Sequence, residues 1–522
     1  MSRVILIRPP MIVVRLVQSR STCPPLGLGY IASSLREAGH EVKIIDAVGE
    51  SIFQMTPINN GRHIIHGLTP DEIVERVDDN FDIIGVSAMF SVEWPLAYQV
   101  IKKLKLRFPH KPIICGGEHV TATASWILKN FQEVDACVLG EGELHFTRLV
   151  GALSLGENGE GLPAVITKSN PIKPHRSGPV DKYLFNLRVH DIDDIPLPAW
   201  DLIRLEEYLD HNFGYGVNRG RNMPMLATRG CPYQCTFCSS PQMWSTRWVA
   251  RKPEKVLSEM ELYLDRYKAE NFSFYDLTAI VKKNWIVEFC NLILKRKHQF
   301  TWQLPSGTRS EAIDEEVAEL LYTSGCRNLN YAPESGSPTV LARIKKKVNL
   351  HSMKKSMKGC LKKGMVIKSN TILGFPGETH REVWQTMKFL VEIAWLGVHE
   401  TTISGYIPYP GTEIYDHLRA TGRLPEYHDE YFWSLATTSN ISKSVSWSDD
   451  ISHRELALYR IFGLLLFYSV SFVRRPQRFF KPLFNIVMGK KEESRMEASL
   501  KALISKLFNK IFKDPFEKVF LR

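Results

Sequence analysis

The sequence lacks the features that mark several common classes of protein. Its 522 residues contain no evident repeat and no low-complexity tract. The first ten residues carry too short an apolar run for a secretory signal, so we expect a cytoplasmic protein. The apolar stretch 459–473 is shorter than the roughly 20 residues that cross a bilayer, and we predict a buried helix there. No nucleic-acid-binding module is recognisable, so no nucleic-acid partner is expected.

Paired cysteines are also missing, which argues against a disulfide framework. Six of the nine cysteines stand singly, as small buried residues usually do: Cys23, Cys115, Cys137, Cys290, Cys326 and Cys360. The other three, Cys231, Cys235 and Cys238, lie close together. A structural zinc site is the alternative for them, but it needs four ligands and no second pair is present. Three thiolates can instead hold an iron-sulfur cluster and leave one iron open to a small ligand.

The spacing Cys231-x-x-x-Cys235-x-x-Cys238, with Phe237 before the last cysteine, resembles the cluster motif of radical S-adenosylmethionine (SAM) enzymes. The resemblance implies that these cysteines bind a [4Fe-4S] cluster whose open iron takes the amino and carboxylate groups of SAM. It also implies that Phe237 lies near the adenine. In that family, one-electron cleavage of SAM gives a 5′-deoxyadenosyl radical that removes hydrogen from an unactivated carbon. The protein supplies position and excludes water.

Residues 1–150 alternate short apolar runs with helical patterns. Strands are predicted at residues 4–7, 42–45, 83–86, 113–115 and 136–139, and helices near 27–38, 71–79, 95–107 and 122–130. This alternation predicts an α/β fold with a doubly wound, Rossmann-like parallel sheet. Ligands of such sheets bind at the carboxyl ends of the strands.

Glycine-rich loops follow those strands and, ahead of the cysteine motif, resemble the cobalamin-binding domain fused to many radical SAM enzymes. By this resemblance the cobalamin contacts are Pro25, Leu26, Gly27, Ser87, Gly116, Gly117, Gly140, Glu141 and Gly142. Glycines at these positions let the backbone approach a large ligand closely. The Asp-x-His-x-x-Gly motif, whose histidine binds cobalt in several other cobalamin proteins, is absent from this part of the chain. His119 lacks the following glycine, so the resemblance implies no protein ligand to cobalt.

The rest of the chain divides into a linker, a second α/β domain and a tail. We expect a linker at 151–222 that includes the proline-containing bridge 191–200, a radical SAM barrel at 223–420, and a helical, basic C-terminal region at 421–522. Six strands are predicted, at 224–228, 272–275, 301–304, 328–332, 367–373 and 401–406. They fit the partial (β/α)6 barrel of the TIM type that the radical SAM resemblance implies.

Polar residues and glycines follow these strands, where barrels of this kind place their functional groups. The family likeness assigns Asp276 and Arg309 to the amino-acid portion of SAM, and Glu334 and Ser335 to its ribose. Gly374 and Gly377 complete the expected SAM contacts, although glycines there also suit a tight turn.

The last 49 residues carry most of the charge excess. Residues 474–522 hold thirteen Lys or Arg against five acids, a net charge of +8 within a total of +11. Apolar residues recur at helical spacing between Leu500 and Phe512, with lysines among them. This basic amphipathic helix either packs back onto the barrel or makes a peripheral contact with a membrane surface.

Together these features resemble the cobalamin-dependent radical SAM methyltransferases, with segments 23–47 and 66–74 similar to carbon-methylating members. The resemblance implies three cofactors: a [4Fe-4S] cluster, SAM and cobalamin. It implies a small-molecule substrate and a one-electron donor such as a flavodoxin or ferredoxin. An oxidative cyclase or ring-rearranging enzyme with the same cofactors is the alternative. The non-enzymatic alternative is a cobalamin-binding or nucleic-acid-associated module whose cysteines are structural.

Overall fold

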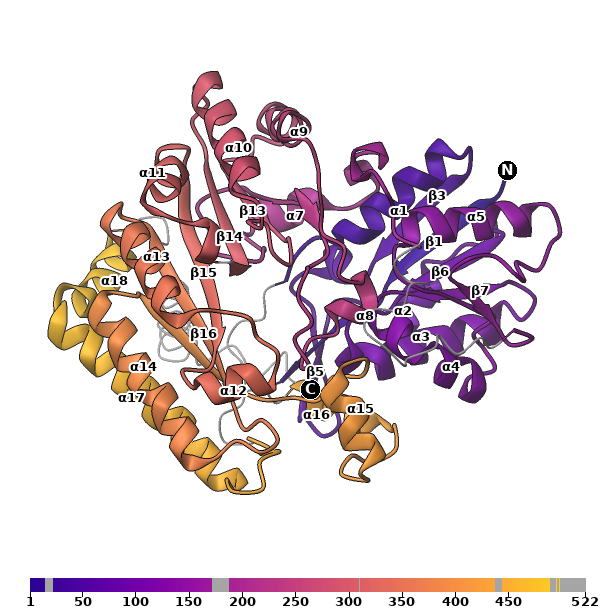
Figure 1. Ribbon diagram of the computed structural model, residues 1–522. Helices are drawn as coiled ribbons and strands as arrows, with labels where there is room; N and C mark the ends of the chain where they lie inside the picture. Colours follow the sequence, from indigo (N-terminus) through magenta and orange to yellow (C-terminus); the bar gives the residue numbers. More distant parts are fainter. Residues whose placement is uncertain are drawn as a thin grey trace, which may run out of the picture.

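The computed structural model describes residues 1–14, 22–170, 187–308, 310–436 and 444–488, together with Ser494 and Glu497. Two sheets covered by helices lie side by side, the N-terminal one at the right of Figure 1 and the second at its left. Arg309 and the predicted helix between Leu500 and Phe512 fall outside the described residues.

The first sheet has the order β3-β1-β6-β7-β8-β9, and all its strands but the last run parallel. Its strands are β1 (Arg3–Arg8), β3 (Glu41–Asp46), β6 (Ile83–Ser87), β7 (Ile113–Gly116), β8 (Ala136–Val138) and β9 (Val165–Thr167). Helices α1 (Leu26–Glu37), α2 (Pro70–Glu75), α3 (Trp94–Arg107), α4 (Glu118–Asn130) and α5 (Gly142–Ser154) alternate with the parallel strands. The Ile- and Val-rich strands are buried on both faces, as parallel strands require. The doubly wound prediction is confirmed, and β9 adds an antiparallel strand beyond residue 150.

A small antiparallel sheet interrupts this alternation. It has the order β2-β5-β4 and consists of β2 (Met11–Val14), β4 (Met55–Ile58) and β5 (His63–His66). Each strand has only four residues, too few to show a clear alternation in the sequence. We therefore did not predict it.

The second sheet contains six parallel strands in the order β10-β13-β14-β15-β16-β17. They are β10 (Asn222–Met225), β13 (Asn271–Phe274), β14 (Thr301–Thr308), β15 (Cys326–Glu334), β16 (Val366–Leu373) and β17 (Glu400–Gly405). Helices α9 (Pro253–Arg266), α10 (Lys283–Arg296), α11 (Glu315–Thr323), α13 (Leu350–Lys362) and α14 (His380–Leu396) connect them. A Thr379/Glu382 capping box starts α14 and Gly397, at φ +117°, ends it. The partial (β/α)6 barrel is confirmed.

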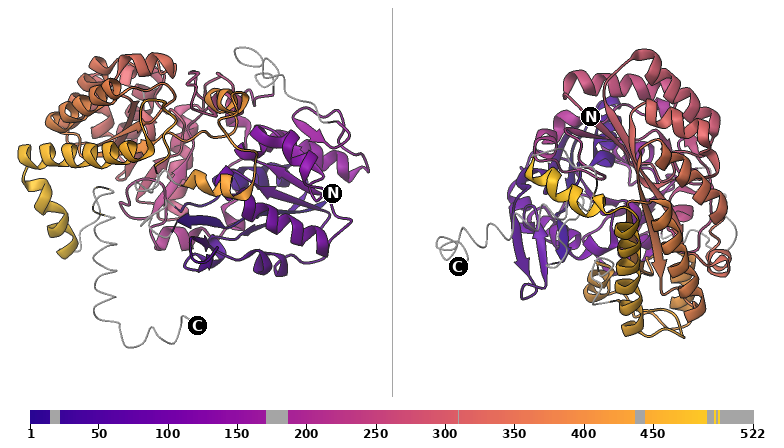
Figure 2. Two further views of the ribbon diagram at one scale, coloured as in Figure 1. Left: turned by 90° about the horizontal axis from the view of Figure 1, so that it is seen from below. Right: turned by 90° about the vertical axis from the view of Figure 1, so that its left-hand side faces the viewer.

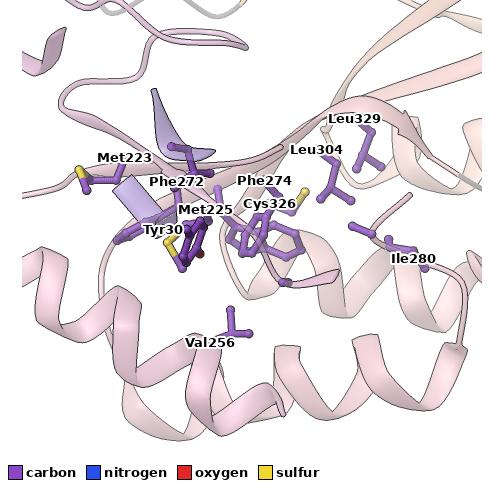
Figure 3. Packing of buried hydrophobic residues seen from close by; sticks show 14 of the residues in the cluster. Tyr30, Met223, Met225, Val256, Phe272, Phe274, Ile280, Leu304, Cys326 and Leu329 are labelled. Carbon is purple, nitrogen blue, oxygen red and sulfur yellow. The ribbon is translucent and has the colours of Figure 1, made fainter. Parts of the chain in front are cut away.

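Two hydrophobic clusters each contain residues of both domains. Tyr30 of α1 packs among Met223, Met225 and Phe272 of the second sheet (Figure 3). The proline-containing bridge lies against α1 and α9: the Ala199 amide donates to the Gly29 carbonyl (3.0 Å), and Trp200 Nε1 donates to Tyr263 OH (2.9 Å). Each half therefore completes the packing of the other.

Short elements fill the loops after these strands and the segment before β10. They are the hairpin β11 (Thr228–Arg229) and β12 (Val249–Ala250), and helices α7 (Leu205–Asp210), α8 (Ser240–Trp244) and α12 (Pro338–Arg343). Helices α15 (Glu413–Ala420) and α16 (Asp429–Ser434) follow β17. Phe432 of α16 contacts the buried His119 ring edge-on at 5.3 Å, so this segment returns to the first domain.

The two last described helices, α17 (His453–Arg474) and α18 (Gln477–Val487), lie at the outer side of the second sheet (Figures 1 and 2). Helix α17 packs on α14 and β17 through Leu456 and Phe467. It is, among the described residues, the one helix long and apolar enough to cross a bilayer, but only 28% of its most apolar window is buried. The prediction of a buried helix is therefore wrong for its outer side.

Candidate active site

The cysteine loop follows the first strand of the second sheet and is fixed by backbone hydrogen bonds. The Thr236 amide donates to the Ile344 carbonyl at the end of α12, and the Ile414 amide of α15 donates to the Thr236 carbonyl, both at 3.1 Å. Within the loop, the Cys238 amide donates to the Cys235 carbonyl at 3.1 Å. Two distant helices thus hold the loop at the carboxyl end of the sheet.

The three thiols are half-buried and influence one another. Burial raises the pKa of the Cys238 thiol to about 12, and the negative charges of Glu118, Cys235 and Cys231 add to the rise. A bound metal reverses this effect, because a thiol that coordinates a cation is deprotonated.

The described part of the chain contains no set of three His, Cys, Asp or Glu side chains that converge on a single metal ion. In a [4Fe-4S] cluster each thiolate binds a different iron, so the three sulfurs need not converge on one point. The arrangement of the cysteine loop is compatible with a cluster.

Aromatic rings connect the cysteine loop to the last two strands. Phe237 contacts Phe375 at 5.8 Å, and Phe375 contacts Tyr406 at 5.0 Å. The Lys346 ammonium lies 6.0 Å from the Phe237 ring and 2.9 Å from Glu334 Oε1. The structure thus brings Phe237, Glu334 and the Gly374 turn to one side of the cysteine loop.

Glu334 and Ser335 are held by the fold. Glu334 has φ +67°, a left-handed conformation that costs about 1–3 kcal/mol outside glycine. The Ser335 hydroxyl is buried, lies 3.1 Å from Thr386 Oγ1 and accepts a hydrogen bond from the Ser337 amide. Ser335 therefore anchors this loop to α14 with its side chain.

Asp276 is also engaged. Its carboxylate accepts hydrogen bonds from the Ala227 amide (3.2 Å), the Thr228 amide and the Thr228 hydroxyl (2.6 Å). Burial raises its pKa to about 6, although these hydrogen bonds oppose the rise. The side chain that we expected at SAM thus fixes the chain three residues before Cys231.

The turn after β16 depends on its glycines and on a carboxyl group that we did not predict. Gly374 and Gly377 have φ +84° and +68°, and a Cβ on Gly374 would lie 2.8 Å from Leu456 Cδ2. Glu378 Oε2 accepts hydrogen bonds from the Gly374 and Phe375 amides. Its Oε1 has no hydrogen-bond partner in the described residues, and burial raises its pKa to about 7.

The predicted cobalamin contacts lie at or near the carboxyl edge of the first sheet, but they differ in how exposed they are. Ser87 and Gly116 pair at the ends of β6 and β7, and Gly27 is exposed with open space around it. Gly117 has φ +119°, and a Cβ there would lie 2.6 Å from the Ala88 carbonyl oxygen. Leu26, in contrast, is buried in a cluster that both domains share.

Two further glycines and a proline lie at the same edge. Gly140 has φ +66°, and its amide donates a hydrogen bond to the Thr121 hydroxyl oxygen at 3.0 Å. Gly142 begins α5 against Ile31. Pro25 precedes α1 as its N-cap residue.

Glu141, which we expected at cobalamin, belongs to a buried ion network between the domains. Its carboxylate accepts from Arg188 Nε (2.9 Å), the Val189 amide (2.7 Å) and an Arg229 guanidinium nitrogen (3.1 Å). Arg229 also binds Glu143 at 2.6 Å. Desolvation disfavours the charge of Arg229, but Glu143 and Glu141 outweigh it and raise the pKa of Arg229. Since Arg229 lies two residues before Cys231, this network ties the first domain to the cysteine loop.

A second contact joins the two edges directly. The hydroxyl of Ser239, the residue after Cys238, donates to Glu118 Oε1 at the start of α4. Burial raises the pKa of the Glu118 carboxyl. The expected cobalamin edge and the expected cluster loop therefore face each other. We did not predict Glu118 as a site residue. Its position directly after Gly116 and Gly117, which we expected at cobalamin, was the feature of the sequence that could have indicated it.

His119 is not placed to bind a metal. Its ring is buried, with Nδ1 2.9 Å from Ser91 Oγ and Nε2 3.3 Å from Thr123 Oγ1. Burial lowers its pKa to about 3. Both nitrogens are used inside the first domain, which agrees with the absence of the cobalt-ligand motif.

Comparison with known families separates the chain into the same two parts. Residues 12–150 match the B12 binding domain, and residues 225–390 match the radical SAM superfamily.

Curated relatives match most of the chain. An uncharacterised methyltransferase of Pyrococcus horikoshii is 29% identical over 89% of this chain and 91% of its own length. The cytidylyl-2-hydroxyethylphosphonate methyltransferase of Streptomyces wedmorensis is 26% identical over 79% and 80%. An anaerobic magnesium-protoporphyrin IX monomethyl ester cyclase of Rubrivivax gelatinosus is 24% identical over 76% and 66%.

Among solved structures, the radical SAM methyltransferase TsrM of Kitasatospora setae, with cobalamin and a [4Fe-4S] cluster bound, shares the fold. Its TM-score is 0.60 at 18% identity, over 81% of this chain and 75% of TsrM.

Proposed function

The chain belongs to the cobalamin-binding radical SAM enzymes, and from this premise we propose that it methylates an unactivated carbon of a small molecule. The contact between Glu118 and Ser239 carries the proposal, because it sets the cobalamin edge against the loop of Cys238. A substrate between these edges would meet both cofactors. Holding reacting groups in such alignment lowers a barrier by about 7–11 kcal/mol.

When bound, the cluster, SAM and cobalamin supply the radical and the methyl group. We propose that Cys231, Cys235 and Cys238 bind the cluster. Phe237, Glu334, Gly374 and Gly377 are the proposed SAM contacts, with Ser335 acting only through its backbone. Gly27, Ser87, Gly116, Gly117, Gly140 and Gly142, with Pro25, are the proposed cobalamin contacts.

Asp276, Glu141 and Arg229 act as positioning residues in this proposal. Asp276 fixes the backbone at Ala227 and Thr228, and the Glu141–Arg229 pair fixes the next residue of the chain. Both interactions are buried, so water does not compete for them. Phe237 and Phe375 form an apolar wall beside the cysteine loop.

The substrate is a small molecule, and we propose that a flavodoxin or ferredoxin in the cytoplasm delivers the electron. We also propose four units: a cobalamin domain at 1–150, a linker at 151–222, the radical SAM barrel at 223–420 and a C-terminal region at 421–522. The start of the linker region contributes β9 (Val165–Thr167) to the sheet of the cobalamin domain.

The test uses full-length protein, reconstituted without oxygen with iron, sulfide and cobalamin, and SAM that carries a deuterated methyl group. A metabolite extract of the source cells serves as the substrate pool. We expect a metabolite to gain one labelled methyl group, with S-adenosylhomocysteine and 5′-deoxyadenosine both released. Formation of 5′-deoxyadenosine without S-adenosylhomocysteine would indicate a cyclase or rearrangement and overturn methyl transfer.

Replacement of one cluster cysteine tests the site itself. Cys235→Ala should abolish the iron-sulfur absorbance and 5′-deoxyadenosine formation, because the cluster loses a ligand. Cys290→Ala is the matched control, since Cys290 lies buried in α10. Bound zinc without inorganic sulfide in the native protein would exclude radical chemistry.

A further inference from the structure

Helix α17 turns its more apolar side outward. Its buried residues include Arg460, Gly463 and Ser471, together with Leu456 and Phe467. The opposite side carries Leu458, Ile461, Phe462, Leu465 and Val473, whose side chains are between 42% and 80% exposed. The first four recur at i, i+3, i+4 and i+7, and Val473 lies at i+15 on the same side, so the five form one stripe along the helix.

The neighbouring helix extends the stripe with two tryptophans. Trp384 and Trp395 of α14 are both more than half exposed. Trp384 contacts the Phe462 ring at 5.7 Å, and the guanidinium of Arg474 lies over the Trp395 ring at 5.1 Å. Three helical turns separate the two tryptophans, so they extend the surface along α14 beside α17.

Helix α18 continues the surface around the end of α17. Its exposed side carries Phe479, Phe480 and Phe484, with Met488 directly after the helix, and the Phe479 ring contacts Phe472 of α17 at 5.5 Å. We call the exposed apolar residues of α14, α17 and α18, with Met488 directly after α18, the α17–α18 surface: Trp384, Trp395, Leu458, Ile461, Phe462, Leu465, Val473, Phe479, Phe480, Phe484 and Met488. Figure 2 shows α17 and α18 at the edge of the molecule.

The orientation of α18 is fixed by arginines. Arg475 donates to the carbonyls of Trp395 (3.2 Å) and Leu396 (3.0 Å), and Arg478 donates to those of Gly397 (2.7 Å) and Val398 (2.9 Å). These are carbonyls at the end of α14, which a cation stabilises. The exposed phenylalanines are thus presented by a helix that the fold holds in place.

The charge of this segment has one sign. From Leu456 to Met488 the sequence has five Lys or Arg and no Asp or Glu. Arg474 and Lys481 are exposed beside the apolar residues. Tryptophan and phenylalanine with flanking Lys and Arg are the composition that lies in the interface of an anionic bilayer.

We propose that the α17–α18 surface rests on an anionic lipid bilayer and holds the enzyme at the membrane face. The contact is peripheral, because Arg460 on the inner side of α17 donates to the Ile403 carbonyl (3.0 Å) and to Ser444 Oγ (2.6 Å). That side belongs to the folded barrel and does not face lipid. The surface exceeds what single exposed side chains explain, since its members are contiguous.

The test measures binding of the full-length, cofactor-loaded protein to two kinds of vesicle. One is phosphatidylcholine alone, and the other contains one quarter phosphatidylglycerol. We expect co-sedimentation with the anionic vesicles, weakened by salt. The double variant F479S/F480S should reduce the partition coefficient by about tenfold or more, because two rings no longer enter the interface. L458S/L465S, on α17, should weaken binding independently.

The matched control is L106S/L155S, which removes two leucines of the first domain that are even more exposed, at 75% and 79%. It should bind like the unaltered protein, and all variants should keep the same circular dichroism and melting temperature. No binding by the unaltered protein, or equal binding by F479S/F480S, overturns the proposal. A dimer that forms without vesicles and that F479S/F480S dissociates would overturn it too, because the surface would then belong to a second copy.

Discussion

Replacing Glu141 with glutamine tests whether the buried ion network positions the cysteine loop. The carboxylate accepts three hydrogen bonds, two of them from guanidinium groups, and its side chain is fully buried. Glutamine keeps the shape but removes the charge and turns an N–H group toward Arg188 or Arg229. Uncompensated burial of a charge after loss of its partner costs about 3–5 kcal/mol. We expect the free energy of unfolding to fall by this amount.

The assay is urea unfolding of the full chain followed by tryptophan fluorescence. Asp201→Asn is the control, because its pair with Arg36 is exposed on both sides and should contribute no more than about 1 kcal/mol. The same E141Q protein should cleave SAM more slowly, by about 10²-fold if the cysteine loop moves by about 1 Å. If E141Q has the same free energy of unfolding as the Asp201→Asn control and cleaves SAM at the normal rate, the network does not position the cysteine loop.

Three other predictions concern the loops around the cofactors. Gly230→Ala should prevent cluster assembly, seen as lost iron-sulfur absorbance, because its Cβ would lie 2.1 Å from the Arg247 carbonyl oxygen at φ +83°. Asp276→Asn should slow SAM cleavage and leave substrate affinity unchanged, since an amide has one acceptor oxygen and cannot accept from both Thr228 and the Ala227 amide, which bind different carboxylate oxygens. Glu378, with its pKa raised from 4.5 to about 7, binds a proton in the native state that it loses on unfolding. Stability should therefore fall by up to about 3 kcal/mol between pH 4.5 and 7, and E378Q should abolish this slope.

The regular alternation of strands and helices made both sheets predictable. The strand predicted at 83–86 is a continuous apolar run, as buried parallel strands usually are, whereas the one at 367–373 contains polar residues and alternates in burial. Both were found within one residue of β6 and β16. The four-residue strands β2, β4 and β5 carry too little pattern for this. The prediction that 459–473 is a buried helix was wrong for the outer side of α17, because an apolar run does not reveal which side of a helix the fold will cover.

The candidate site was predictable only where a motif has a fixed spacing. Cys231, Cys235 and Cys238 are three points on one short loop, so their proximity follows from the sequence. The partners of Glu141 and Asp276 lie 47 to 88 residues away, and only the folded chain brings them together. The family resemblance led us to expect both at cofactors, and the structure adds the protein groups to which their carboxylates bond.

The insertion of Tyr30 between the two sheets restricts how this enzyme can be rebuilt. A foreign cobalamin module grafted in front of the barrel would leave Met223, Met225 and Phe272 facing solvent unless it supplied an equivalent aromatic side chain. The two halves are therefore not interchangeable cassettes. A chimera that replaces everything up to β9 would lose α1. It should therefore keep α1 of this chain together with the barrel whose packing Tyr30 completes.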